Sequence, residues 1–315
     1  MDFSISVIIP AFNVERFIEK AIRSALQQSQ VNEVVVVNDG STDKTIEILE
    51  SLKNENPKVK IYHHKNQVNL GRSASRNLGI IKATENFIAF LDADDFYLKD
   101  RFVSDKKIFQ SLENIDGVYN AVGFHFYRKA KTTESQNLKL NTLTKKLAPE
   151  DFFEAIIASK YGYLHLNGIT VKASVFKTIG LFNKSLMVAE DSDIIFKMAL
   201  KCRLAPSQLN TALALRGIHD NNVFNQEALY KTYNIKLYES LINWSLKNKI
   251  SYKNIDVILN WLWFFKFREN KKITNYISYW FYLVINNPKL LFSKLSIKYF
   301  PIIRLRQKLF PFLFK

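Results

Sequence analysis

The sequence predicts an α/β fold built on a doubly wound parallel sheet. Three observations predict it. Short β-branched apolar segments recur through the first hundred residues, a helical spacing of apolar residues follows each of the first three, and polar or glycine-containing turns lie between them. Strands that are buried on both faces appear as continuous apolar runs, and strands that alternate with helices form parallel sheets. With 315 residues the chain is long enough for one large or two modest domains.

The first hundred residues contain four expected strands and three expected helices. Strands are expected at residues 6–9, 34–37, 59–62 and 87–91, and helices at residues 15–29, 41–52 and 71–83. Ligands of such sheets bind outside the carboxyl ends of the strands. The sequence therefore predicts a binding site formed by residues 10–13, 38–42 and 92–95.

Beyond residue 100 the pattern is mixed and then becomes helical. Residues 118–127 and 212–216 are expected to be strands, residues 149–158 and 191–200 helices, and residues 129–146 an exposed loop. From about residue 227 no Val-rich segment follows, and Lys, Asn, Ile, Leu and aromatic residues dominate. We therefore expect a domain at residues 1–225 and a helical C-terminal region at residues 226–315.

Charge and composition exclude several classes of protein. The chain has 45 Lys and Arg against 29 Asp and Glu, a net charge of +16. From residue 245 to the end, 14 Lys and Arg face only Asp256 and Glu269, so this segment carries +12. Apolar residues at 47% and aromatic residues at 14% exclude a disordered or fibrous chain. A single cysteine, Cys202, excludes a disulfide scaffold and fits a reducing cytosol.

No targeting or membrane-spanning segment is expected. The N-terminus has Asp2 where a signal peptide needs positive charge. The longest uncharged segment, residues 273–288, is shorter than the about 20 apolar residues that cross a bilayer. A buried or interfacial helix is the expected structure of this segment.

Acidic residues cluster at positions 92, 94 and 95, directly after an expected strand. Two carboxylates one residue apart can reach one hard cation and leave positions for phosphate oxygens and water. Alternatively, Asp94 and Asp95 cap a helix that begins near Phe96. The local pattern does not separate the two interpretations.

Four other positions have a structural and a functional interpretation. Asp39 lies in a tight strand-to-helix turn, where it either shapes the turn or contacts a nucleobase. Arg72, beside Gly71 at a helix start, either faces a diphosphate or is a solvated charge. Asp191, at another helix start, is either a cap or a reacting carboxylate, and His219 is either structural or a ligand.

Five motifs in this order resemble the family 2 glycosyltransferases, which have the GT-A fold. The motifs are Ser-Val-Ile-Ile-Pro-Ala-Phe-Asn at residues 6–13, Asn-Asp-Gly-Ser-Thr-Asp at 38–43, Asn-x-Gly…Ala-x-Arg-Asn at 69–77, Phe-Leu-Asp-Ala-Asp-Asp at 90–95 and Glu-Asp at 190–191. The resemblance covers roughly residues 4–222 and does not include the basic C-terminal region. It implies a nucleotide-sugar donor, usually a UDP-sugar, and inversion at the anomeric carbon.

The resemblance also implies roles for individual residues. Donor binding is implied for Pro10, Ala11, Asn13, Glu15, Asp39, Gly71, Arg76, Asp92 and Ala93, with Asp39 on the base and Asp92 near the ribose. Asp94 is implied to bind Mn²⁺ or Mg²⁺ on the diphosphate, and His219 to approach the metal or the diphosphate. Asp191 matches the general base, which would take the proton of a hydroxyl that is a poor nucleophile at neutral pH.

Two departures from the family pattern refine the expectation. Asn38 stands where many members carry another aspartate, which weakens a base-pocket role at this position. The Gln-x-x-Arg-Trp motif of processive synthases is absent from the sequence. We therefore expect transfer of one sugar, or a few, to an acceptor.

The basic C-terminal region has three interpretations. From Trp261 onward, 16 aromatic residues in 55 positions are interleaved with Lys and Arg, which suits contact with an anionic membrane. A bacterial lipid-linked oligosaccharide, lipopolysaccharide or capsule precursor would be a natural acceptor there, on the cytoplasmic face of the inner membrane. An ordinary helical bundle with a solvated basic face is the second interpretation. Nucleic-acid binding is the third, but no motif of a nucleic-acid module supports it.

Two rival functions differ in class from sugar transfer. A catalytically silent sugar- or membrane-binding protein could use the same scaffold, although Asp92, Asp94 and Asp191 argue against it. A nucleotidyltransferase would show a Gly-rich basic loop after the first strand, where this chain has Pro-Ala-Phe-Asn. Both are disfavoured by the residues present.

Overall fold

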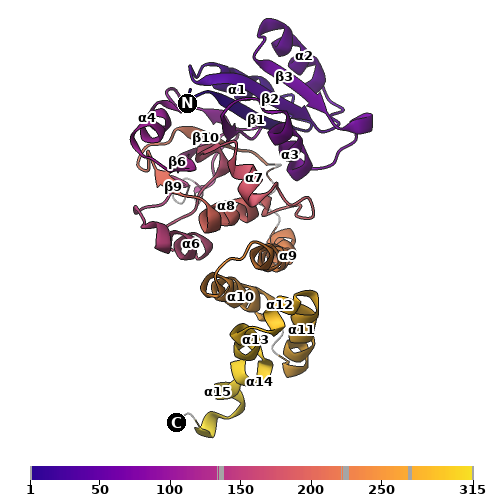
Figure 1. Ribbon diagram of the computed structural model, residues 1–315. Helices are drawn as coiled ribbons and strands as arrows, with labels where there is room; N and C mark the ends of the chain where they lie inside the picture. Colours follow the sequence, from indigo (N-terminus) through magenta and orange to yellow (C-terminus); the bar gives the residue numbers. More distant parts are fainter. Residues whose placement is uncertain are drawn as a thin grey trace. The chain divides into compact units, whose positions relative to one another are not determined.

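The chain divides into two compact units, Met1–Gln226 and Glu227–Lys315, which we call unit 1 and unit 2. The computed structural model describes residues 2–132, 134, 138–220, 222, 227–268 and 272–313. Figure 1 shows unit 1 in indigo through magenta to orange and the helices of unit 2 in orange to yellow. Each unit is described by itself.

Unit 1 contains strands and helices in alternation. Its strands are β1 (Ile5–Ala11), β2 (Val31–Asn38), β3 (Val59–His63), β4 (Phe87–Phe90), β5 (Phe96–Tyr97), β6 (Gly117–Tyr119), β7 (Val122–Phe126), β8 (Ile169–Lys172), β9 (Leu204–Pro206) and β10 (Ala214–Ile218). Its helices are α1 (Ile18–Leu26), α2 (Thr45–Glu55), α3 (Arg72–Lys82), α4 (Val103–Ser111), α6 (Pro149–Ile157), α7 (Val175–Ile179) and α8 (Glu190–Lys201). The four strands expected in the first hundred residues are present.

The central sheet has seven strands in the order β3-β2-β1-β4-β8-β6-β9. Strands β1 to β4 pair in parallel, as the sequence predicts. β8, which the sequence analysis did not anticipate, is antiparallel to both β4 and β6. The sheet is therefore mixed, because β8 runs in the opposite direction to both of its neighbours.

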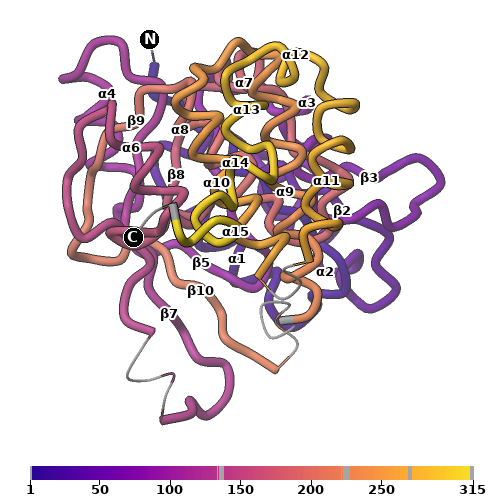
Figure 2. The backbone as a smooth tube through the Cα atoms, turned by 90° about the horizontal axis from the view of Figure 1, so that it is seen from below, coloured from indigo at the N-terminus to yellow at the C-terminus, as the bar shows by residue number. Residues whose placement is uncertain are grey.

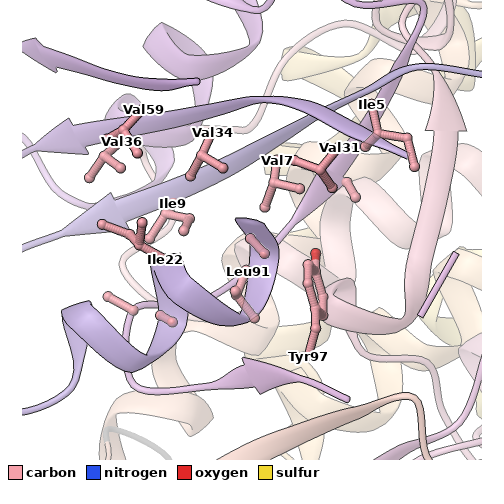
Figure 3. Close-up of a cluster of buried hydrophobic side chains, with 14 of the residues drawn as sticks. Ile5, Val7, Ile9, Ile22, Val31, Val34, Val36, Val59, Leu91 and Tyr97 are labelled. Carbon is pink, nitrogen blue, oxygen red and sulfur yellow. The ribbon is translucent and has the colours of Figure 1, made fainter. Parts of the chain in front are cut away.

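Helices cover both faces of the parallel strands. Ile5, Val7 and Ile9 of β1 belong to one core cluster with the apolar faces of α1 and α2 (Figure 3). Ile8, on the opposite face, lies against α3, where a Cβ added to Gly79 would be 2.4 Å from its side chain. Because successive side chains of a strand point to opposite faces, the Val run of β2 serves both layers.

The segment after β4 differs from the sequence-based expectation in two places. Phe96 and Tyr97 form strand β5 rather than the start of a helix, so Asp94 and Asp95 do not cap one. Residues 118–127 form two strands in different sheets, β6 in the large sheet and β7 in a small sheet of order β5-β10-β7 (Figure 2). Asn120 and Ala121, between them, are buried, so the chain changes sheet inside the core.

Unit 2 is helical, as its composition predicts. It contains α9 (Glu227–Lys247), α10 (Tyr252–Phe267), α11 (Ile273–Asn286), α12 (Pro288–Leu291), α13 (Lys294–Tyr299), α14 (Pro301–Arg304) and α15 (Arg306–Leu309). Aromatic side chains form much of its interior, for example Phe267 stacked on Tyr276 with 3.8 Å between ring centroids. In the part of the chain that the structure describes, none of the helices combines the length and apolar character needed to span a bilayer.

Candidate functional site

The loops after β1 and β2 are held together by side chains that the sequence analysis assigned to a nucleoside pocket. Asn13 accepts a hydrogen bond from the Thr42 amide at 2.8 Å, and Glu15 accepts one from the Lys44 amide at 2.9 Å. Both side chains are exposed. Pro10 and Ala11 are the last residues of β1. These four residues therefore lie at the carboxyl edge of the sheet, where the motif places a ligand.

Asp39 joins the second and third motifs. Its two carboxylate oxygens accept hydrogen bonds from the amides of Leu70 and Gly71, at 2.7 and 2.9 Å. Its Oδ1 also lies 3.4 Å from Nε2 of His64. Gly71 has a φ of +86°, which favours glycine, and the next residue begins α3. The buried Asp39 thus positions the start of α3 beside the loop after β2.

Arg76, on α3, connects the acidic motif after β4 with the start of α8. Its guanidinium donates to Asp92 Oδ1 at 2.6 Å and to Glu190 Oε1 at 2.9 Å. The side chains of Arg76 and Glu190 are each 3% exposed, and that of Asp92 is 28% exposed. Two positions far apart in the sequence are therefore fixed by one buried cation.

The pKa values of this cluster follow from burial and from the ion pairs. Burial alone would lower the pKa of Arg76, but the charges of Asp92 and Glu190 outweigh it and raise that pKa. Burial likewise opposes ionisation of Asp92, and Arg76 overcomes it and holds the pKa of Asp92 at about 2. For Glu190 burial prevails over Arg76, so the pKa of Glu190 is raised.

Asp191 lies in the first turn of α8, next to Glu190. The residue before the helix, Ala189, is buried and has a left-handed backbone with φ +62°, which is uncommon without a glycine. This turn directs Glu190 into the core and leaves Asp191 half-buried. Asp191 Oδ1 accepts a hydrogen bond from the Ser192 amide at 2.7 Å, which orients the carboxylate.

Asp94 meets His219, although 125 residues separate them. His219 Nε2 lies 2.9 Å from Asp94 Oδ2, and Asn222 Nδ2 lies 3.3 Å from the same oxygen. The His219 ring stacks on Phe17, with 4.9 Å between centroids. The segments that contain Asp94 and His219 can approach this closely only with a glycine at position 217, because a Cβ on Gly217 would be 2.2 Å from the Asp94 carbonyl oxygen.

Asp95 and His165 complete a second group of polar side chains. Single ligand atoms of Asp92, Asp95 and His165 lie within 4.8 Å of one another. Asp95 is buried, and its oxygens accept hydrogen bonds from Asn167 Nδ2 and from the Gly217 amide. Burial, together with the charges of Asp94 and Asp92, raises the pKa of Asp95 well above its usual range. Burial and the charge of Arg216 lower the pKa of His165.

The pair Asp94 and His219 suits a divalent cation better than the second group does. In an octahedral Mg²⁺ site with bonds of about 2.1 Å, adjacent ligand atoms are about 3 Å apart. The 2.9 Å between Asp94 Oδ2 and His219 Nε2 fits this spacing. In the second group, Asp92 is already paired with the Arg76 cation, which opposes a further cation there, whereas the amide that Asn222 offers to Asp94 Oδ2 is neutral. A carboxylate and an imidazole are ligands that Mn²⁺ accepts.

The structure brings together residues that the motifs placed at separate positions. Asp94 and His219 are in contact, and Asp39 accepts a hydrogen bond from the Gly71 amide. Arg76 joins Asp92 to Glu190, which precedes Asp191 in the sequence. Ala93 instead points into the core cluster beneath β1.

Two buried polar residues near the acidic motif were missed by the sequence analysis. They are His165 and Asn167. The Asn167 Oδ1 also accepts a hydrogen bond from the Asp92 amide at 3.3 Å. The backbone carbonyl oxygen of Asn167 accepts two hydrogen bonds from the guanidinium of the buried Arg101. No spacing in the sequence points to either residue, since they follow a segment without a strand or helix periodicity.

Comparisons with known sequences agree with the motifs. The sequence model of glycosyl transferase family 2 matches residues 6–162. A Haemophilus influenzae protein described as an uncharacterized glycosyltransferase is 30% identical over 230 residues, which are 71% of this chain and 69% of that protein. A second H. influenzae glycosyltransferase is 35% identical over 144 residues and Bacillus subtilis EpsJ 31% over 197 residues, each match covering 54% of the relative. The chain thus spans about half the length of these two relatives.

Solved structures show the same fold at low sequence identity. The crystal structure of residues 1–349 of S. aureus TarS has a TM-score of 0.60 and 19% identity, covering 85% of this chain and 72% of that one. A complex of the same TarS fragment with UDP-GlcNAc has a TM-score of 0.59 at 20% identity. The mannosyltransferase PcManGT of Pyrobaculum calidifontis, in complex with GDP-Man and Mn²⁺, has a TM-score of 0.53 at 15% identity and covers 98% of this chain and 87% of that one.

Proposed function

The chain belongs to glycosyltransferase family 2 and has the GT-A fold, and we propose that it moves one hexosyl or N-acetylhexosaminyl group from a UDP-sugar to an acceptor hydroxyl. One observation carries this proposal. The buried Arg76 links Asp92, in the motif assigned to the donor, with Glu190, which is adjacent to the proposed base. This link supports a single site in which donor and base lie on one edge of the sheet.

We assign the proton transfer to Asp191. The Ser192 amide holds one of its carboxylate oxygens, and the other is assigned to the acceptor hydroxyl. As the acceptor oxygen forms its bond to the anomeric carbon, the carboxylate takes the proton and the bond from that carbon to the diphosphate oxygen breaks. The electron pair leaves with the nucleoside diphosphate. A single displacement of this kind inverts the anomeric configuration.

Asp94 and His219 are proposed to hold the divalent cation, Mn²⁺ or Mg²⁺. Such a cation supplies Lewis-acid stabilisation for the negative charge of the departing diphosphate. The contact of Phe17 with the imidazole ring and the hydrogen bond from Asn222 keep the two side chains facing one another. Asp39, Gly71 and the residues after β1 are proposed to surround the nucleoside.

The proposed activity is tested by measuring UDP release from a panel of UDP-sugars with the purified chain. We expect release with at least one donor in Mn²⁺ or Mg²⁺, and a decrease of at least about tenfold in EDTA that added metal restores. A catalytically silent scaffold would bind a donor without releasing UDP. Release that is unaffected by EDTA would contradict the assignment of Asp94 and His219.

We further propose that unit 2 contacts an anionic membrane on the cytoplasmic face of the inner membrane. The acceptor would then be a lipid-linked or lipopolysaccharide or capsule precursor. Exposed large apolar side chains are frequent in this unit: Phe264, Phe281, Tyr282, Ile285, Leu291, Phe292, Ile297, Ile302, Ile303, Leu309, Phe310 and Phe312. Lys and Arg lie between them, and together they suit the headgroup region of an anionic bilayer.

Replacing Ile285 and Phe292 by aspartate should weaken membrane binding. These side chains are 71% and 88% exposed, so the loss of contact should not be accompanied by loss of the fold. We expect at least about a tenfold lower partition into phosphatidylglycerol vesicles in a flotation assay, from the lost apolar burial of two side chains. Ile81→Asp, on α3 of unit 1 and 66% exposed, is the matched control. Unchanged flotation of the double variant would contradict the membrane proposal.

A further inference from the structure

A groove of about 1020 Å³ lies within unit 2, between α9, α10 and α11. Its described lining residues combine cations with aromatic rings and amides. They are Tyr230, Lys231, Thr232, Asn234, Ile235, Lys236, Glu239, Phe265, Lys266, Phe267, Arg268, Asn275, Ser278, Tyr279 and Tyr282. None of these residues belongs to the site proposed for sugar transfer.

The charge of the groove is positive. Four of the described lining residues are cationic, and Glu239 is the one acid among them. The Glu239 carboxylate accepts a hydrogen bond from the Tyr279 hydroxyl, so it is already engaged in the wall of the groove. The net positive charge favours an anionic ligand.

Aromatic rings position two of the ammonium groups. Lys236 Nζ lies 4.6 Å from the ring centroid of Tyr233, and Lys266 Nζ lies 4.5 Å from that of Tyr279. A ring face attracts a cation but does not use all three of its N–H donors. Both groups can therefore donate to phosphate oxygens, which form strong charge-assisted hydrogen bonds.

The groove adjoins an exposed apolar strip on α11. Tyr282 lines the groove and is itself exposed, and Ile285 follows it three residues later on the same side of the helix. Phe281, which is 50% exposed, lies beside them. A ligand with its charge in the groove could therefore lay an apolar chain along α11.

We propose that this groove binds the phosphate or diphosphate group of a lipid-linked acceptor, with the apolar chain along α11. Of the candidate anions, a phosphate attached to a long apolar chain uses both the cations and the adjoining strip. The proposal rests on the proposed function, in that it names the chemical class of the acceptor. It places acceptor recognition in unit 2 and donor chemistry in unit 1.

Calorimetric titration with farnesyl diphosphate, a water-soluble polyprenyl diphosphate, tests the groove directly in the full chain. EDTA is present throughout, so that metal-dependent binding at the donor site does not contribute. We expect farnesyl diphosphate to bind at least about tenfold more tightly than inorganic pyrophosphate, since only the former buries an apolar chain. Equal affinities would overturn the assignment of the apolar strip.

Substitutions locate the binding. The triple variant Lys236→Ala, Lys266→Ala, Arg268→Ala should lose at least about tenfold in affinity for farnesyl diphosphate because it removes three charge-assisted contacts. The matched control, Lys247→Ala, Lys289→Ala, Lys294→Ala, removes the same charge from exposed positions outside the groove and should change affinity less than about twofold. If the triple variant does not fold, Lys236→Ala alone, at an exposed position, should still weaken binding by at least threefold, about 0.7 kcal/mol.

Equal losses in the groove and control variants would overturn the proposal. So would loss of binding in Asp94→Asn, because the diphosphate would then occupy the donor site. UDP release without acceptor separates the two proposals, since it depends on unit 1 and should be the same in the groove variant and the unmodified chain. Absence of UDP release with intact farnesyl diphosphate binding would count against the proposed function alone.

Discussion

Asp191→Asn should lower kcat for sugar transfer by about 10²–10⁴-fold, the usual contribution of a positioned general base. Asparagine has nearly the same shape, and its side-chain oxygen can still accept the hydrogen bond from the Ser192 amide. The first turn of α8 should therefore keep its structure while the proton acceptor is lost. The KM for the donor should change little, because Asp191 is assigned to the acceptor hydroxyl.

The measurement is a steady-state assay of transfer with the donor that the UDP-release panel identifies. Asp151→Asn is the control, because Asp151, like Asp191, is an acid in the first turn of a helix of unit 1, although it is exposed where Asp191 is half-buried. It should retain the activity of the unmodified chain. Full transfer activity in Asp191→Asn would show that another group takes the proton.

Arg76→Met should lower the free energy of unfolding of unit 1 by about 3–5 kcal/mol. The substitution keeps an unbranched side chain of similar length, but it leaves the carboxylates of Asp92 and Glu190 without the cation that both of them bind. Glu190 is almost fully buried, so its uncompensated charge is the larger part of the expected loss. Thermal or urea unfolding followed by circular dichroism measures the change.

Two further variants make the Arg76 result specific. Arg72→Met removes a cation that is 38% exposed and 3.4 Å from Glu190, and it should cost at most about 1 kcal/mol. Arg76→Met combined with Glu190→Gln should recover part of the loss, because the neutral amide needs no counter-charge. If Arg76→Met were as stable as Arg72→Met, the ion pairs would not hold α3 and α8 together.

Local pattern was sufficient to predict much of unit 1. The parallel strands β1 to β4 and the helices α1 to α3 follow from the alternation of buried β-branched runs with helical spacing. The predictions were wrong where long-range packing decides the conformation. Residues 96–97 form a strand rather than a helix, since they pair with β10 more than a hundred residues away. β8 was missed because its pairing partners, β4 and β6, lie in other parts of the chain.

The candidate site shows the same division. The sequence by itself determined the family, the parallel sheet and the edge at which the polar motifs meet, because those depend on residue types at short spacing. Only the tertiary structure decided that Arg76 bridges Asp92 and Glu190, that Asp94 meets His219, and that His165 and Asn167 join them. Arg76 and Glu190 are 114 residues apart, and Asp94 and His219 125. Contacts of this kind depend on sheet register and helix packing, which no local pattern of residues specifies.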